Sequence, residues 1–310
     1  NTSLTPQPPL NSAPHRFVAG IKLGKVDPTV EPTVIDSASS VVVVDANASF
    51  AALGWQRGRT LLIDKAKSSG IAALSMRNCF HFSALWHEVE ELAEAGLVGI
   101  AFLNSKSFVA HYGSTDAAQI YGTNPMAFAF PRRPEAGPPL VWDQASAMMA
   151  RGEISLAQEA GQILPDGCAI DRSGKPTTDP TAALDGAQLT FGGAKGMCIA
   201  MMVELLAAGM NSSPLSMDAR RTDCDETSAS PTCNGEFIIA IDPSKMGLDG
   251  DEFYEHSEKL FRTIEELDGA QLPSTGWHAG ADRWNIRAES EKNGVEIPSH
   301  LWDDIVALEG

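Results

Sequence analysis

Residues 78–86 join a predicted strand to a predicted helix and read Asn78-Cys79-Phe80-His81-Phe82-Ser83-Ala84-Leu85-Trp86. The apolar run over residues 71–76 comes just before this stretch and predicts a strand. Ser83 can cap the amphipathic helix expected over 83–95, on which Leu85, Val89 and Leu92 share one face. Residues 97–103 then predict another strand. A helix between two strands indicates a chain that mixes helices with a sheet.

The other predicted elements lie on both sides of this stretch. The β-branched run Val41-Val42-Val43-Val44 ends at Asp45 and predicts a buried strand. A helix is expected over 56–68, with Gly70 as its left-handed cap. Further strands are predicted over 126–130, 140–142 and 237–241, and further helices over 251–267 and 299–308. Residues 197–210 are apolar nearly all round and predict a buried helix, whereas 212–234 predict a long polar loop.

The composition restricts the class of protein. A chain of 310 residues with 43% hydrophobic residues can bury a large core, which suggests two domains. A net charge of −17 argues against nucleic-acid binding and indicates a solvated acidic surface. No apolar run is long enough to span a bilayer, and no secretory signal is visible. The five cysteines lack metal-binding spacing, although Cys224 and Cys233 could pair; we expect a reduced, cytoplasmic protein.

Glycine patterns bear on nucleotide binding. No G-x-G-x-x-G follows a predicted strand, so a standard Rossmann site is not indicated. The run Gly192-Gly193-Ala194-Lys195-Gly196 lacks the order of a P-loop, because Gly196 rather than Ser or Thr follows Lys195. Two interpretations remain open: a plain tight turn, or a turn whose cation and following helix N-terminus hold a diphosphate.

Two histidines were weighed for chemistry. His81 lies between a predicted strand and helix, where side chains often reach a cleft, and a neutral imidazole suits proton transfer. An isolated histidine is more often structural. The run from His87 to Glu91 would need a second histidine where Glu91 stands to bind zinc, so a solvated helix face is expected and no metal site.

Two aspartates follow predicted strands or turns. Asp143 closes the strand over 140–142, where a carboxylate can orient a ribose, a nicotinamide amide or a protonated imine. The alternative is an N-cap for the turn that follows. Asp179 precedes Pro180 and is interpreted as a turn residue.

Five segments, taken in order, carry a family resemblance. They are the 78–86 stretch, Gly122-Thr123-Asn124-Pro125-Met126-Ala127-Phe128, Asp143-Gln144-Ala145-Ser146, Thr177-Thr178-Asp179-Pro180 and Phe191-Gly192-Gly193-Ala194-Lys195-Gly196. Together they resemble the malate/L-lactate dehydrogenase-like NAD(P)H oxidoreductases. Residues 80–86 look most like the branch that reduces delta-1-piperideine-2-carboxylate and delta-1-pyrroline-2-carboxylate.

The resemblance implies an α+β fold with a non-Rossmann cofactor domain of mixed sheet and helices, and a homodimer. It implies an outer domain over 15–76 and 286–310, formed by both chain ends, around a cofactor-binding and catalytic domain over 77–285. Residues 1–14, which carry four prolines, are expected to be a disordered or truncated N-terminal segment.

The resemblance also implies site residues and a cofactor. His81 and Asp143 are expected to be catalytic. Contacts to NADPH, with NADH as the alternative, are expected from Ser105, Thr123, Asn124, Asp143, Gln144, Ala145, Ser146, Ala194, Lys195, Asp282 and Arg283. Arg283 would pair with a phosphate or, more simply, sit in a surface ion pair. Asp116 lies in a region that the family uses for cofactor contacts, and its charge suits a free ribose better than a phosphate.

The chain departs from the family pattern in one place. Relatives carry a Ser-His-Gly whose histidine is taken as the acid/base, and an ungapped count back from Leu23-Gly24-Lys25-Val26 places it at Pro8-Pro9-Leu10. We expect either a truncated copy or a relative that lost this acid. The expected function is NAD(P)H-dependent reduction of small cyclic imino acids to proline or pipecolate. The alternatives are a malate/lactate-type 2-hydroxyacid dehydrogenase and a catalytically silent NAD(P)H-binding relative.

Overall fold

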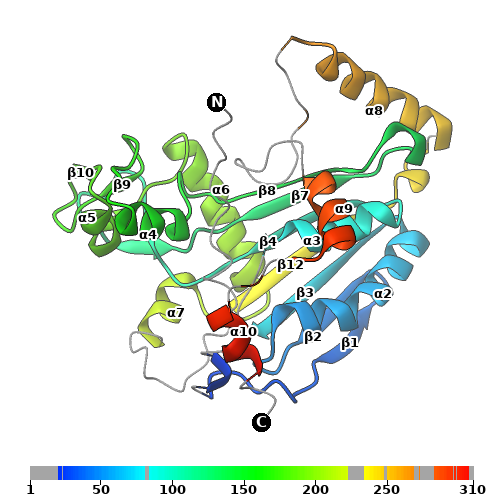
Figure 1. The fold of residues 1–310 in the computed structure, drawn as a ribbon. Coiled ribbons are helices and arrows are strands. Elements are labelled where there is room, and N and C mark those ends of the chain that lie inside the picture. The colour runs from blue at the N-terminus through cyan, green and yellow to red at the C-terminus, as the bar shows by residue number, and fades with distance from the viewer. Residues whose placement is uncertain are drawn as a thin grey trace.

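A seven-stranded mixed sheet forms the centre of the molecule (Figure 1). The computed structural model describes residues 20–22, 24–80, 84–222, 234–247, 250–268, 272, 283–295, 297 and 299–306. In spatial order the strands are β1 (Thr33–Ala38), β2 (Val41–Asp45), β3 (Ile71–Cys79), β12 (Asn234–Ile241), β4 (Val98–Leu103), β7 (Met126–Phe130) and β8 (Leu140–Gln144). Only β2 and β3 pair in parallel in this sheet. The long connection through a helix explains that pair, because parallel neighbours require a crossover.

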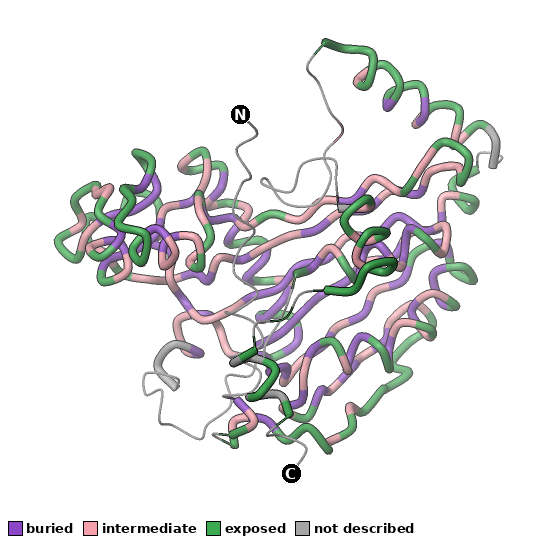
Figure 2. The backbone as a smooth tube through the Cα atoms, viewed as in Figure 1, coloured by how far each residue is buried: buried purple, intermediate pink, exposed green. Residues whose placement is uncertain are grey.

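Alternating side chains along β12 divide the core into two layers. Ile238 faces the helices α2 (Ala51–Ser69) and α3 (Trp86–Glu94), whereas Phe237 faces α6 (Ala194–Glu204) and a π-helical turn, η2 (Leu205–Gly209). Figure 2 shows the central strands largely in purple, between these two layers. The period of two residues places neighbouring side chains on opposite faces, so the sheet is covered on both sides.

Two glycines set the distance between α2 and the sheet. A Cβ at Gly54 would collide with Met76 Sδ, and one at Gly58 would lie 2.7 Å from Leu74 Cδ1. Glycine is a poor helix former, and the predicted helix begins only at residue 56, after Gly54. The helix begins at Ala51 because close packing on the sheet outweighs this propensity.

A second, five-stranded sheet with short helices lies to one side (Figure 1). Its strands, in spatial order, are β10 (Pro176–Thr177), β9 (Ala169–Ile170), β11 (Ala187–Gln188), β5 (Val109–Ala110) and β6 (Gln119–Tyr121). The helices α4 (Arg151–Glu159) and α5 (Pro180–Asp185) pack on each other beside it. These strands of two or three residues carry too little periodic pattern to be predicted from sequence.

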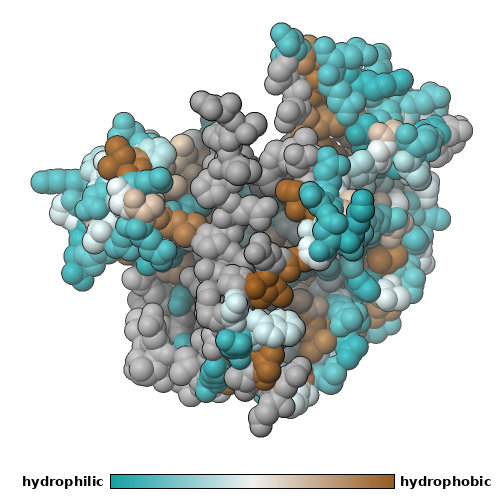
Figure 3. All heavy atoms as spheres, viewed as in Figure 1, coloured by the Kyte–Doolittle hydropathy of each residue, from teal (hydrophilic) through white to brown (hydrophobic). Residues whose placement is uncertain are grey.

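The remaining elements are short connections and the later helices. They are η1 (Pro134–Ala136), α7 (Ser216–Thr222), η3 (Pro243–Lys245), α8 (Gly250–Glu265), α9 (Arg283–Asn293) and α10 (Ser299–Val306). Arg132 joins α8 to the β7–β8 hairpin through Glu258, with Nη2 to Oε2 at 2.8 Å. Hydrophilic residues cover most of α8 in Figure 3, in keeping with the acidic composition. Within the described ranges, no helix has both the length and the apolar character needed to cross a membrane.

Most predicted elements are confirmed, with shifted ends. The strand over 126–130 is β7, the strand over 71–76 extends to Cys79, and Gly70 caps α2 with φ 86°. Ser83 lies outside the described residues, and the position before α3 is Leu85. The predicted helix over 197–210 begins earlier and ends in a π-helical turn. The mixed α+β class is confirmed.

Two predictions about this region are wrong. Full burial of the 197–210 helix fails, because Met201, Met202 and Leu205 are 39%, 39% and 57% exposed. Only one side of the helix reaches the sheet, through Val203 among others. The loop expected over 212–234 contains helix α7, which begins at Ser216, where a side chain and a backbone amide both bind a buried carboxylate.

Candidate functional site

The Gly122–Asn124 turn is tied into the interior by one amide side chain. Asn124 is fully buried and has a left-handed backbone with φ 41°. Its Nδ2 donates to Glu204 Oε2 at 2.7 Å and to the carbonyl oxygen of Ala200 at 2.9 Å. Ser146 Oγ donates to the Asn124 carbonyl at 2.6 Å, and the Ser146 N–H donates to the Thr123 carbonyl at 2.8 Å. Two of the sequence motifs are therefore joined to α6.

The Glu204 carboxylate is the centre of this network. It is 7% exposed and accepts from the Ser216 N–H at 2.6 Å, from Ser216 Oγ at 2.7 Å and from Asn104 Nδ2 at 3.5 Å. Asn104 Oδ1 in turn accepts from the Gly235 N–H at 3.0 Å. A buried charge surrounded by donors fixes its partners in place. The network thus anchors the loop after β4, the Asn124 turn, α6 and α7 to one another.

The segment after β8 leads from the second motif to the glycine turn. Ala147 and Thr190 form an antiparallel bridge, and the Phe191 N–H donates to the Ser146 carbonyl at 3.1 Å. The Met148 N–H donates to the Leu189 carbonyl at 2.8 Å. Three motifs that are distant in sequence, at 122–124, 143–146 and 191–195, therefore lie next to one another.

The Gly192–Gly193 turn presents the N-terminus of α6 to solvent. Both glycines have positive φ, 57° and 60°, and Gly193 occupies the N-cap. Thr190 Oγ1 donates to the Gly193 carbonyl at 2.8 Å, which fixes the turn. Ala194 and Lys195, in the first turn of the helix, are exposed. A helix N-terminus together with one cation is the arrangement that binds a phosphate group.

A cavity of about 220 Å³ opens beside this turn. Its lining residues are Ala110, Tyr112, Met148, Gly167, Leu189, Thr190, Gly192 and Gly193. Tyr112 is 55% exposed and lies against the turn, since a Cβ at Gly193 would be 3.0 Å from Tyr112 Cε2. An apolar cavity with an aromatic wall, next to a helix N-terminus of this kind, has room for part of a nucleotide.

Asp143 lies within β8 and binds the N-terminus of a helix from another part of the chain. Asp143 Oδ2 accepts from the Trp86 N–H at 3.2 Å, at the first residue of α3. In this bond Asp143 caps helix α3 and not the turn that follows Asp143, which was the alternative interpretation. The following residue, Gln144, is still in the strand and is exposed. A carboxylate at a helix N-terminus is stabilised by the helix dipole.

Two further carboxyls are buried on the same face of the sheet, and sequence analysis missed them. Glu88 is 6% exposed on α3, and Glu236 is 1% exposed on β12. The expectation of a solvated face from His87 to Glu91 is wrong for Glu88 and also for Glu90, which is 3% exposed. The signal was present, because Glu88 falls at helical spacing between Leu85 and Leu92 on the apolar face.

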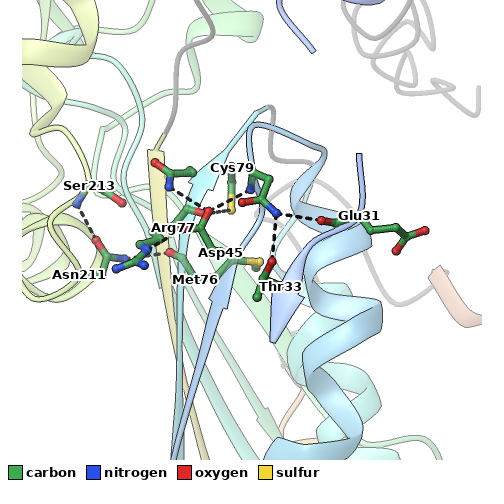
Figure 4. Close-up of polar contacts among 10 residues, drawn as sticks. Glu31, Thr33, Asp45, Met76, Arg77, Cys79, Asn211 and Ser213 are labelled. Carbon is green, nitrogen blue, oxygen red and sulfur yellow. Dashed lines mark hydrogen bonds and ion pairs between the residues drawn. The ribbon is translucent and has the colours of Figure 1, made fainter. Parts of the chain in front are cut away.

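A polar network at the ends of β2 and β3 supports the start of the 78–86 stretch (Figure 4). Asp45 Oδ1 accepts from Asn78 Nδ2 at 2.9 Å and from the Asn47 N–H at 3.0 Å, and Oδ2 pairs with Arg77 Nε at 3.0 Å. Asn78 has φ 54°, in the left-handed region that asparagine tolerates better than most residues. The hydrogen bond from its side chain to Asp45 helps to hold this backbone conformation. Burial alone would raise the pKa of Asp45, but these hydrogen bonds and the Arg77 charge outweigh burial and hold that pKa below its usual range.

Asp45→Asn should lower the free energy of unfolding at neutral pH by about 1 to 2 kcal/mol, because the charge-assisted bonds are lost. The stabilisation is fully present above the ordinary carboxyl pKa of 3.8 and disappears as the pH falls through the lowered folded value. Urea unfolding of both proteins at neutral and acidic pH checks this. The exposed residue Asp64, on α2, provides the control Asp64→Asn. An Asp45→Asn loss that is equally large at both pH values would contradict the role of the charge.

The predicted site residues fall into three groups. Described and gathered around the three joined motifs are Ser105, Thr123, Asn124, Asp143, Gln144, Ala145, Ser146, Ala194 and Lys195. Ser105 contacts the Gly122 turn, where a Cβ would lie 2.5 Å from Ser105 Oγ. His81 and Asp282 lie outside the described residues, as do Cys224 and Cys233, and Arg283 is the first residue of α9. The cofactor and catalytic roles of these residues stay predictions.

Known proteins resemble this chain over most of its length. A delta(1)-pyrroline-2-carboxylate reductase of Burkholderia multivorans is 44% identical over 292 residues, which cover 94% of this chain and 82% of that protein. A delta(1)-pyrroline-2-carboxylate/delta(1)-piperideine-2-carboxylate reductase of Pseudomonas aeruginosa is 44% identical over 295 residues, covering 94% and 84%. The solved structure of delta1-piperideine-2-carboxylate reductase from Pseudomonas syringae pvar. tomato superposes with a TM-score of 0.83 at 37% identity, covering 93% and 84%.

The fold and the joined motifs define an oxidoreductase of mixed α+β architecture. The model of the malate/L-lactate dehydrogenase family matches residues 12–306. The chain belongs to the malate/L-lactate dehydrogenase family, and the resemblance inferred from the five segments is confirmed.

Proposed function

We propose that this protein is an NAD(P)H-dependent reductase of small cyclic imino acids, which converts delta-1-pyrroline-2-carboxylate or delta-1-piperideine-2-carboxylate to proline or pipecolate. The single observation that carries the proposal is the junction of three motifs around Ser146, which binds Thr123 on one side and Phe191 on the other. The names of relatives at 44% identity specify the substrate class.

The cofactor fits the turn at the start of α6. The first-turn amides and Lys195 would hold the diphosphate, and the cavity beside Tyr112 would take an adjacent part of the nucleotide. When bound, the reduced nicotinamide supplies a hydride to the carbon of the C=N bond. We propose NADPH as the preferred cofactor. NADH is the alternative, and the acidic residue Asp116, which would suit a free ribose, favours that alternative.

Asp143 and His81 are the proposed catalytic residues. The half-buried Asp143 carboxylate, held by the Trp86 amide, would stabilise the proton on the imine nitrogen as hydride reaches the neighbouring carbon. His81 is proposed to line the site and to exchange the proton. Buried Asn124 is fully engaged through Nδ2 and would act by shaping the turn rather than through that amide group.

The proposal includes an assembly and an architecture. We propose a homodimer in the cytoplasm, and the exposed apolar residues Met201, Met202, Leu205 and Met210 on one side of the α6–η2 segment support a partner surface. We propose a non-Rossmann cofactor domain over 77–285. The outer domain would comprise 15–76 and 286–310, and its β1–β2 pair joins the central sheet through β3.

The test is oxidation of NADPH by this chain with delta-1-pyrroline-2-carboxylate, pyruvate and oxaloacetate, each assayed at the absorbance band of the reduced cofactor. Turnover should favour the imine. Turnover that favours pyruvate or oxaloacetate would make the protein a 2-hydroxyacid dehydrogenase. Tight NADPH binding without turnover on any of the three would indicate a catalytically silent relative.

Lys195→Met should weaken NADPH binding about tenfold, because one charge-assisted contact to phosphate is lost at an exposed helix N-terminus. Turnover at saturating NADPH should change little. Fluorescence titration of NADPH measures the first quantity and steady-state kinetics the second. Lys67→Met removes an equally exposed lysine on α2 and is the control. Unchanged NADPH affinity in Lys195→Met would remove this lysine from the cofactor site.

A further inference from the structure

Three carboxyls lie close together where α3 meets the sheet. Asp143 on β8 binds the first residue of α3 through the Trp86 N–H, and Glu88 lies in the first turn of the same helix. Glu236 lies at the start of β12, where it pairs with Leu103 of β4. The alternation along the strands places Asp143 and Glu236 on the α3 side of the sheet.

The carboxyls of Glu88 and Glu236 lack the hydrogen-bond partners that a buried charge needs. Neither oxygen of Glu236 has a hydrogen-bond partner, and Glu88 Oε2 has none either, in the part of the chain that the structure describes. Of the two strands that border Glu236, β4 carries no charged residue, and the one charge on β3 is Arg77, which pairs with Asp45. An unpaired ionised carboxyl is too costly in such surroundings, so the group keeps its proton instead.

The electrostatic surroundings agree with this geometry. Burial, and the negative charges of Glu91 and Asp143, raise the pKa of Glu88 to about 7. Burial raises the pKa of Glu236 well above its usual range, and the carboxyl of Glu88 raises it further. Because coupling between two groups is reciprocal, ionisation of Glu88 also disfavours the negative charge on Asp143.

We propose that Glu88 and Glu236 form a pair of buried, protonated carboxyls next to Asp143. In this pair Glu88 is a positioning residue, because its protonation state controls the charge of Asp143 beside the reacting imine. This inference rests on the proposed role of Asp143. While Glu88 is neutral, Asp143 carries the negative charge at the N-terminus of α3 and stabilises the protonated imine. When Glu88 loses its proton, two negative charges compete at one helix N-terminus and turnover falls.

The pair also makes folding depend on pH in a defined direction. Both carboxyls bind their protons more tightly in the folded than in the unfolded protein. Both contributions to stability are therefore fully present below the ordinary glutamate pKa of 4.5. The contribution of Glu88 is lost as the pH rises through about 7, and that of Glu236 is lost as the pH rises through its own raised pKa. A carboxyl with the same pKa in the folded and unfolded protein would produce no such dependence.

The experiment uses the full chain and two isosteric variants, Glu88→Gln and Glu236→Gln. Urea midpoints and the pH profile of turnover are measured between about pH 5.5 and pH 9, on both sides of the Glu88 transition. In the unmodified protein the urea midpoint and the turnover should both fall as the pH rises through about 7. Glu88→Gln should remove that step, leaving about tenfold more relative turnover at the alkaline end. Glu236→Gln should move the step to lower pH, because an amide can donate to the Glu88 carboxylate and has no charge of its own.

Glu94→Gln, at the exposed end of α3, is the control and should keep the unmodified profile. The infrared carbonyl band of a protonated carboxylic acid, present in the unmodified protein near neutral pH and lost in Glu236→Gln, gives a readout that needs no substrate. An active protein whose pH profile and urea midpoints are the same with and without Glu88→Gln would overturn the inference. A protein without imine turnover would overturn the proposed function instead, while the infrared and unfolding measurements would still decide the fate of the pair.

Discussion

Asp143→Asn should lower turnover with the cyclic imine by about 10²- to 10⁴-fold, the range typical of a lost acid or base group. The fold should survive, because an asparagine oxygen can still accept from the Trp86 N–H that Asp143 Oδ2 binds at 3.2 Å. What disappears is the negative charge that we propose to stabilise the proton on the imine nitrogen. Steady-state kinetics with NADPH, together with a urea unfolding curve of the same preparation, separates the loss of turnover from a loss of stability.

The matched control for this variant is Asp179→Asn. Asp179 also holds a helix N-terminus, with Oδ1 accepting from the Thr181 N–H at 3.0 Å at the start of α5. Asp179 has the same chemistry at a place that the proposed reaction does not use. Turnover by Asp179→Asn should therefore stay within about twofold of the unmodified protein, as for most surface substitutions. A comparable loss in both variants, or none in Asp143→Asn, would leave Asp143 with only a capping role.

Glu204→Ala should have the largest effect on stability, a loss of about 3 to 5 kcal/mol in the free energy of unfolding. The substitution removes the acceptor of two bonds from Ser216 and one each from Asn124 and Asn104. These donors are buried and would be left without their partner. Urea unfolding at neutral pH measures the change.

Loss of Glu204 should also weaken NADPH binding. Glu204 holds Asn124, and Asn124 is joined to Ser146, so the motifs of the proposed cofactor site would lose their fixed arrangement. Glu159→Ala, at the exposed end of α4, is the control and should stay within about 0.5 kcal/mol of the unmodified protein. A Glu204→Ala loss below about 1 kcal/mol would mean that the four donors find other acceptors, contrary to the proposed central role.

The long elements of the central part of the chain can be predicted because each carries a clear local pattern. The Val41–Val44 strand follows from a continuous β-branched run, and α3 follows from an apolar face that repeats about every 3.6 residues. The five-stranded sheet was not predicted, because a strand such as Ala169–Ile170 shows no period at all. The order of five motifs, rather than any one of them, identified the family.

For part of the candidate site, the sequence predicts which residues belong to it but not how they are arranged in space. Asn124 was identified from its motif, but its bond to Glu204 spans a sequence distance that no local pattern reveals. Glu88 was assigned to solvent because glutamate is usually exposed. The helical spacing of Leu85 and Leu92 does place residue 88 on the apolar face of α3. That Asp143 and Glu236, from two distant strands, lie beside it follows only from tertiary packing.

The contact between α9 and α3 has a consequence for how the protein is made. Arg287 Nη2 lies 2.6 Å from Glu90 Oε1, and its guanidinium covers the Trp86 ring at 5.6 Å from the centroid. Trp86 is the residue whose amide binds Asp143. During translation α3 leaves the ribosome long before Arg287, and a nascent chain stopped upstream of Arg287 leaves Glu90 without this cation. A chain that ends before Arg287 therefore lacks a contact beside the Trp86 ring, so the surroundings of the amide that binds Asp143 are completed only late in synthesis.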